Sequence, residues 1–304
     1  MAGEPLSISQ AIVIGIVEGL TEFLPVSSTA HNQIIPQFLG WGDPGAAFSA
    51  VIQLGPIVAI IAYFGKEIVR YLKGIARTKT PFNLPAEDVD ARLGWYALMG
   101  SLPILAVGFL LKKQIEGSFR SLYVVASAFI VFGIVLYLAE RASKMNRKLE
   151  DLTWTDSLVI GFGQCLALIP GTSRSGATLT AGFFRNIDRD SATRFSFLLS
   201  IPALAAAGLY ELYKDVIKPR AFEQIVPFTV GTVVAGIVAF VVIHWFLGFI
   251  RRHNMNVFII YRLIMGTLIL ILLQTGTLKD VPHGKVTEAK TTSEITKTLH
   301  IAHK

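Results

Sequence analysis

The sequence predicts an all-α integral membrane protein, because of its composition and the way its apolar residues are distributed. Of 304 residues, 52% are hydrophobic and 16% are charged, and the mean hydropathy is +0.55. A soluble domain usually carries about 25% charged residues. The apolar residues gather in blocks of about 20, the length that a helix needs to cross a hydrocarbon core of roughly 30 Å. Lipid is therefore the expected solvent for most of the chain.

Six apolar blocks are predicted to span the membrane, and two further apolar segments are interrupted. The predicted spans are residues 48–64, 95–111, 122–139, 195–213, 226–250 and 257–273. The interrupted segments, 8–39 and 157–184, carry Pro, Gly, Ser, Thr and ionisable residues near their middles. Non-helical backbone inside a membrane is tolerated only where protein or a wet cavity satisfies its polar groups. Each interrupted segment is therefore predicted to be a re-entrant helical hairpin with a functional turn.

The two interrupted segments resemble each other, which indicates that the chain is duplicated. Residues 15–18 (GIVE) match residues 161–164 (GFGQ), and residues 25–28 (PVSS) match residues 170–173 (PGTS) after one deletion. The matches recur with a period of about 146 residues, far longer than the periods of solenoid repeats. Each half would hold one hairpin and three spans, and this odd number of crossings would invert the second half. Inverted repeats commonly place a binding site between them near the bilayer midplane.

The predicted halves are residues 1–139 and 140–274, followed by a polar tail, 275–304, to which no structure is assigned. Basic residues in the loops orient this topology. One side carries Lys66, Arg70, Lys73, Arg77, Lys79, Arg92, Arg141, Lys144, Arg147, Lys148, Arg185, Arg189, Arg194, Arg251 and Arg252. The other carries Lys112, Lys113, Arg120, Lys214, Lys218 and Arg220. The first side is predicted to be cytoplasmic and both termini extracytoplasmic. The net charge of +7 thus reflects orientation and argues against nucleic-acid binding.

The first interrupted segment places two carboxylates on one face of a helix. Glu18 and Glu22 are four residues apart, so both side chains project from the same side, one turn apart. A carboxylate inside an apolar block costs several kcal/mol unless it is paired or hydrated, which favours a functional role over a position at a wet membrane surface. The pair could coordinate Mg²⁺ or Ca²⁺ through oxygen, or one carboxyl could act as an acid or base.

Hydroxyl groups and an imidazole follow at the predicted turn of this segment. Ser27, Ser28 and Thr29 come directly after Pro25-Val26. His31 lies three residues beyond Ser28. A hydroxyl near an imidazole can form a nucleophile and its base. Serine clusters after proline also form ordinary turns, so the catalytic and the structural interpretations both stay open here.

The second interrupted segment adds a cation inside a glycine-rich turn, residues 170–178 (PGTSRSGAT). A glycine-rich turn that opens a helix presents backbone N–H groups to an anion. Arg174 within it can bind phosphate oxygens through two parallel hydrogen bonds. This turn is the sharper of the two signals, because an arginine among small hydroxyl residues between apolar stretches is rarely placed there for packing.

Three other polar residues lie inside apolar segments. Gln164 is the counterpart of Glu18 in the repeat and suits either a hydrogen bond between helices or contact with a substrate. Arg262 and His244 lie near the ends of their predicted spans, so their side chains are expected to extend to the membrane surface.

At these residues the chain resembles the bacterial undecaprenyl-diphosphate phosphatase family of the bacitracin-resistance type. The family's Glu-x-x-x-Glu motif matches Glu18 and Glu22, and its two longer blocks match residues 25–31 and 170–178. Ala30 stands where the family has glycine, which removes no functional group. The resemblance covers residues 8 to 274 and implies hydrolysis of undecaprenyl diphosphate to the monophosphate and phosphate in the bacterial inner membrane. It also implies a divalent cation, recycling of the carrier lipid for peptidoglycan synthesis, and resistance to bacitracin.

The resemblance also implies roles for particular residues. The catalytic set would be Glu18, Glu22, Ser28, His31 and Arg174. The substrate-binding set would be Ser27, Thr29, Gln164, Ser173, Ser175 and Thr178. Within the first set the two glutamates would hold Mg²⁺ or Ca²⁺ or position the reacting group, and the arginine would bind the diphosphate. The attacking group, Ser28 or an activated water, stays open.

Two other functions fit parts of the pattern. A lipid transporter or flippase would share the inverted repeats and broken helices without cleaving the headgroup. A type 2 phosphatidic-acid phosphatase is disfavoured, because its Pro-Ser-Gly-His block does not occur in the sequence. The predicted partners are the polyprenyl diphosphate and the surrounding membrane lipids, with no nucleic acid, and the sequence is compatible with a homo-oligomer.

Overall fold

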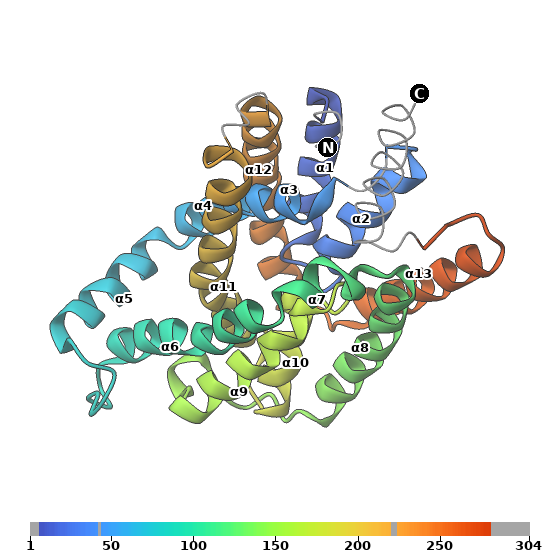
Figure 1. The fold of residues 1–304 in the computed structure, drawn as a ribbon. Helices are drawn as coiled ribbons and strands as arrows, with labels where there is room; N and C mark the ends of the chain where they lie inside the picture. The colour runs from blue at the N-terminus through green and yellow to red at the C-terminus, as the bar shows by residue number, and fades with distance from the viewer. Residues whose placement is uncertain (1–5, 42–43, 220–223, 281–304) are drawn as a thin grey trace, which may run out of the picture.

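The computed structural model describes residues 6–41, 44–219 and 224–280, and its secondary structure there is helical apart from one isolated bridge between Arg147 and Ile187. The α-helices are α1 (Ile8–Thr21), α2 (Ser28–Phe38), α3 (Gly45–Ile52), α4 (Leu54–Tyr63), α5 (Gly65–Thr78), α6 (Val89–Leu110), α7 (Lys112–Glu116), α8 (Leu122–Ala142), α9 (Trp154–Cys165), α10 (Arg174–Phe184), α11 (Arg189–Leu212), α12 (Ile225–Ile250) and α13 (Asn256–Gln274). Helices α1, α11 and α12 run side by side, with α9 and α10 below them in the view of Figure 1.

Within the described residues, five helices are long and apolar enough to cross a membrane: α6, α8, α11 with its π-helical extension to Ile217, α12 and α13. They contain five of the six predicted spans, which confirms the all-α membrane class. The remaining predicted span, 48–64, is divided between α3 and α4 and continues into α5 after a bend of 85°. Helix α5 carries charged residues such as Lys66, Arg70 and Lys73, whose burial in hydrocarbon is costly.

Both interrupted segments form pairs of short helices separated by a turn, as predicted. Segment 8–39 is α1 and α2, and segment 157–184 is α9, a short 3-10 helix and α10. Ser27 precedes α2 with φ of 71°, and Ser173 precedes α10 with φ of 70°. A left-handed conformation is unfavourable for a serine, so both turns must be held by their surroundings. The backbone is thus alike at these two serines, while the duplication and the inversion of the second half stay predictions.

Small residues bring the helices into close contact. A Cβ atom added to Gly15 in α1 would lie 2.6 Å from the carbonyl oxygen of Gly231 in α12. One added to Gly161 in α9 would lie 2.2 Å from the carbonyl oxygen of Gly100 in α6. Both distances are too short for any larger residue. Close backbone approach supplies the packing that stabilises helices in lipid, where the hydrophobic effect between them is weak.

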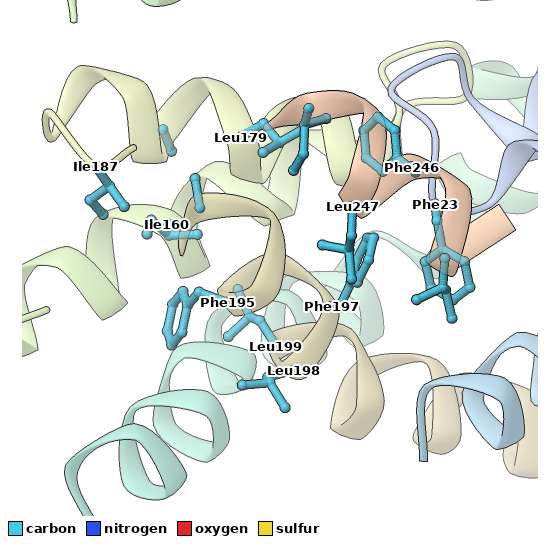
Figure 2. Close-up of a cluster of buried hydrophobic side chains, with 14 of the residues drawn as sticks. Phe23, Ile160, Leu179, Ile187, Phe195, Phe197, Leu198, Leu199, Phe246 and Leu247 are labelled. Carbon is cyan, nitrogen blue, oxygen red and sulfur yellow. The ribbon is translucent and has the colours of Figure 1, made fainter. Parts of the chain in front are cut away.

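An aromatic cluster anchors the first hairpin turn to the second half of the chain. Phe23 follows directly after Glu22, and its ring centroid lies 4.8 Å from that of Phe197 in α11. Phe197 in turn lies 6.4 Å from Phe246 in α12. Figure 2 shows these three rings among the buried apolar side chains. Tilted aromatic contacts of this kind add about 0.5–1.5 kcal/mol each beyond the area that they bury.

A network of ion pairs joins the loop before α9 to the end of α10. Asp156 accepts hydrogen bonds from Arg147 (2.5 Å) and from Arg185 (2.6 Å). Burial opposes the charged carboxylate, but hydrogen bonds from Arg147, Thr153 and Arg185 outweigh it and hold the pKa of Asp156 well below its usual range. The network therefore stays ionised at neutral pH and fixes the outer ends of the second hairpin.

Candidate active site

The first hairpin turn places a carboxylate against a hydroxyl. Helix α1 ends four residues before Pro25. The proline ring disfavours helical geometry in the preceding residue, Leu24. Helix α2 begins at Ser28, whose Oγ donates a hydrogen bond of 2.5 Å to Oε2 of Glu22. Both side chains are buried. A hydroxyl hydrogen-bonded to a buried carboxylate has the arrangement of a nucleophile with its base.

The second hairpin turn places a guanidinium at the start of a helix. Gly171, with φ of 94°, supplies a backbone conformation that other residues adopt only with strain. Ser173 caps α10 by accepting a hydrogen bond of 3.1 Å from the backbone N–H of Gly176. Arg174 is the first residue of α10, so its side chain lies beside the positive end of the helix dipole. Two sources of positive charge thus coincide at this turn.

The two turns meet in the interior of the protein. Arg174 Nη2 donates a hydrogen bond of 2.9 Å to Glu22 Oε1, and Arg174 Nη1 donates one of 3.2 Å to the carbonyl of Ser196 in α11. The backbone N–H of Gly171 donates to Ser27 Oγ (3.1 Å). A buried ion pair contributes little net stability, because desolvation offsets the attraction between the charges. Its burial therefore points to function.

A cavity of about 470 Å³ opens from this junction. Its polar end is formed by Glu22, Ser27, Ser28, Thr29, Ser173 and Arg174. Its walls include Ile104, Leu105, Phe109, Leu168 and Leu204. Further polar residues also line it, among them Lys112, which donates a hydrogen bond of 2.9 Å to the hydroxyl of Tyr210. A molecule with an anionic head and an apolar tail matches this lining, because the head can contact the polar side chains of the two turns and the tail can contact the apolar side chains.

Several predicted site residues lie beside the cavity without lining it. Ser175 Oγ donates to the carbonyl of Leu24 (2.9 Å), and Thr178 Oγ1 is hydrogen-bonded to Ser196 Oγ (2.6 Å). These bonds connect α10 to the first turn and to α11. Gln164 is fully buried, and neither atom of its carboxamide has a hydrogen-bond partner among the described residues. Its proposed contact with a substrate stays a prediction.

His31 lies behind the first turn. Its Nδ1 is 2.7 Å from the carbonyl oxygen of Ser27, and its Nε2 is 2.5 Å from the hydroxyl of Tyr261. With Nδ1 as the donor to the carbonyl, Nε2 accepts from the tyrosine. Both ring nitrogens are therefore occupied by protein groups. Through these contacts His31 holds the turn that carries Ser28. Its predicted role as an acid or base stays a prediction.

Arg262 is the main residue that the sequence-based interpretation misplaced. The expectation that it reaches the membrane surface is wrong, because its side chain is fully buried and donates to carbonyl groups of both hairpin turns. His244, by contrast, is exposed, and its expected reach to the membrane surface stays a prediction. Asn32 was not singled out either, and its side-chain amide donates to Glu18 Oε2. Only the position of Arg262 inside an apolar block could have indicated its importance.

Glu18 and Glu22 are the two residues that would hold a divalent cation together with a phosphate. Glu18 Oε1 is buried without a hydrogen-bond partner in the described part of the chain, and Glu22 lines the cavity one helical turn away. Groups of three or more His, Cys, Asp or Glu side chains suited to a metal are absent from the described residues. Mg²⁺ is typically held by one or two carboxylates together with waters and substrate phosphates. A pair of glutamates is thus an adequate protein contribution.

Comparison with known proteins identifies the family of the chain. The family model for the bacitracin resistance protein BacA matches residues 11–268. An undecaprenyl-diphosphatase of Myxococcus xanthus is 47% identical over 280 residues, covering 91% of this chain and 92% of its own. An undecaprenyl-diphosphatase of Pelodictyon phaeoclathratiforme is 46% identical over 287 residues, covering 90% of this chain and 100% of its own. The chain therefore belongs to the bacitracin resistance protein BacA family.

Proposed function

We propose that the protein hydrolyses undecaprenyl diphosphate to undecaprenyl phosphate and inorganic phosphate. The observation that carries this proposal is one cavity that is lined both by Glu22, Ser28 and Arg174 and by apolar side chains such as Leu105 and Phe109. The diphosphate would occupy the polar end, and the isoprenoid chain would follow the apolar walls toward lipid. The names of the curated relatives agree with this substrate.

Arg174 is proposed to bind the diphosphate. In the structure its Nη atoms donate to Glu22 and to the carbonyl of Ser196, while its buried Nε has no partner among the described residues. A guanidinium can offer two parallel N–H groups to phosphate oxygens, which an ammonium cannot. The negative charge on the phosphoryl group that is transferred is thereby offset, and phosphoryl transfer depends mainly on such charge stabilisation and on positioning.

Ser28 is proposed to attack the terminal phosphorus. As the bond from Ser28 Oγ to phosphorus forms, the bond from phosphorus to the bridging oxygen breaks, and undecaprenyl phosphate leaves. Glu22 Oε2 is 2.5 Å from Ser28 Oγ and can accept its proton. Water then hydrolyses the phosphoserine to release inorganic phosphate. The alternative, direct attack by water, would use the same carboxylate as base.

A divalent cation is proposed to be held by Glu22 and Glu18, with the diphosphate completing its coordination. When bound, such an ion neutralises phosphate charge and orients the reacting oxygens. Asn32 supports this arrangement, because its amide donates to Glu18 Oε2 and leaves Oε1 without a partner among the described residues.

The cellular role that follows is recycling of the carrier lipid in the bacterial plasma membrane. Release of undecaprenyl phosphate returns the carrier to peptidoglycan synthesis, and depletion of the diphosphate removes the lipid that bacitracin sequesters. The residues around the cavity include Lys112 and Arg120, which belong to the side predicted to be extracytoplasmic. We therefore propose that the site is reached from the outer leaflet.

The test is phosphate release from undecaprenyl diphosphate by the purified full-length protein in detergent. Hydrolysis proceeds in detergent, whereas transport needs a sealed membrane, so the assay separates the phosphatase from a flippase. We expect equal amounts of inorganic phosphate and undecaprenyl phosphate. Movement of the lipid across vesicles without phosphate release in detergent would favour the transporter instead.

A further inference from the structure

Arg262 in α13 is bonded to both hairpin turns at once. Its Nη1 donates to the carbonyl of Pro25 in the first turn (3.0 Å) and to that of Thr172 in the second (2.9 Å). Its Nη2 donates to the carbonyl of Gly171 (2.9 Å). A single guanidinium nitrogen thus bridges the two halves of the site. The bridged carbonyls lie within three residues of Ser28 and Arg174 along the chain.

The remaining bonds of Arg262 fix its position against α8. Its Nη2 and Nε donate to the carbonyls of Ala128 (3.2 Å) and Phe129 (3.3 Å). The guanidinium carbon lies 5.5 Å from the centre of the Phe129 ring. Within the described part of the chain its polar partners are all backbone carbonyls, and burying a cation among neutral groups is costly. That cost argues for a specific role rather than for packing.

The neighbouring residue of α13 reaches the first turn by a second route. The hydroxyl of Tyr261 lies 2.5 Å from Nε2 of His31, and the two rings stack with centroids 5.7 Å apart. His31 Nδ1 lies 2.7 Å from the carbonyl oxygen of Ser27. Ser27 has φ of 71°, a conformation that needs external support. Consecutive residues of one helix therefore hold the backbone on the N-terminal side of Ser28.

We propose that Tyr261 and Arg262 are positioning residues that hold Ser28 and Arg174 in register for the reaction. Neither residue lines the cavity, so neither contacts the substrate. They act through the backbone of the two turns, which must stay aligned although they come from different halves of the chain. This inference rests on the proposed phosphatase activity and extends it to α13. Misplacement of reacting groups by about 1 Å can lower a rate by roughly a hundredfold.

The test compares Arg262→Lys with Arg147→Lys in the purified full-length protein. Arg147 is a matched control, because its guanidinium also joins separate loops through the carbonyls of Asp151 and Arg185, yet it contacts neither turn. For each variant, kcat per folded molecule and KM for undecaprenyl diphosphate are measured well below the unfolding transition. We expect Arg262→Lys to lower kcat roughly 10- to 100-fold with KM changed less than about threefold. Arg147→Lys should lower Tm and leave kcat per folded molecule unchanged.

Tyr261→Phe provides a second variant that keeps the ring and removes only the hydroxyl bonded to His31. We expect a loss of kcat of about three- to tenfold, the value of one hydrogen bond, with the protein folded and KM retained. If Arg262→Lys does not fold, Tyr261→Phe decides the proposal. A variant whose kcat per folded molecule equals that of the wild type, even if less of it is folded, overturns the positioning role of the replaced residue. A wild-type protein that releases no phosphate overturns the proposed function itself.

Discussion

Ser28 Oγ donates a hydrogen bond of 2.5 Å to Glu22 Oε2, so the hydroxyl and the carboxylate face each other across the break between α1 and α2. The other oxygen of the same carboxylate accepts from Arg174, which comes from the opposite half of the chain. Glu22 is thus the point at which the proposed nucleophile and the proposed phosphate ligand meet. An uninterrupted helix could not place Ser28 beside Glu22, because residues six apart lie on different faces.

Replacement of the hydroxyl tests the role of Ser28. We expect Ser28→Ala to lower kcat by a factor of roughly 10³ or more, because it removes the proposed attacking atom while leaving Glu22 and Arg174 in place. Ser200→Ala is the matched control, since the hydrogen bond that this buried hydroxyl donates to the carbonyl of Phe197 stays within α11. The control should retain near-normal turnover. A Ser28→Ala protein that turns over at the wild-type rate would show that water attacks directly.

Arg174→Lys keeps the positive charge and removes the planar arrangement of donors. Contacts made mainly in the transition state are worth about 3–4 kcal/mol, so we expect kcat to fall roughly a hundred- to a thousandfold. The change in Tm should be small, because the cation beside Glu22 is retained. Arg194→Lys is the control, as Arg194 pairs with Asp190 within one turn of α11 and does not line the cavity. Near-normal hydrolysis by folded Arg174→Lys protein would rule out the proposed diphosphate contact.

Removal of divalent ions tests the role of the two glutamates. We expect thorough chelation to lower hydrolysis by roughly a hundredfold or more, and Mg²⁺ or Ca²⁺ to restore it, because phosphate charge would otherwise be unbalanced. Chelator already saturated with Mg²⁺ serves as the control for direct effects on the protein. Activity that survives chelation unchanged would mean that Glu18 and Glu22 act as acid or base without a metal.

Much of the fold follows from local properties of the sequence. Apolar length identifies five of the spans, and Pro25 and Pro170 together with small polar residues locate the two breaks, because these features act on the backbone nearby. The bend between α4 and α5 was not predicted. It depends on how the charged helix α5 packs against α6 through Tyr71 and Gly74, which is a tertiary effect.

The site itself was predicted in part. Glu22, Ser28 and Arg174 were identified because charged and hydroxyl side chains are conspicuous in an apolar segment, and the structure brings all three together. The role of Arg262 was missed, since its position in the sequence near the end of a span says nothing of the carbonyls that converge on it. The apolar walls of the cavity were also beyond prediction, because residues such as Leu105 look like any lipid-facing leucine until the packing is known.

The orientation of the chain in the membrane gives a further prediction. The asymmetry of basic loop residues predicts that both termini are extracytoplasmic. A reporter that is active only in the cytoplasm, fused after Lys304, should therefore be inactive, while the same reporter inserted in the loop after Thr78 should be active. Activity of the C-terminal fusion would overturn this topology and, with it, the inverted relation of the two halves.

The most direct test of the account is the turnover of the double variant Ser28→Ala with Arg174→Lys, measured as phosphate release beside each single variant. Residues that act together on one phosphate lose most of their effect once either is removed, whereas independent residues multiply their losses. If the two turns form one catalytic unit, the double variant should be no slower than the slower single variant by more than about threefold. A double variant whose loss of kcat equals the product of the two single losses would contradict a shared site.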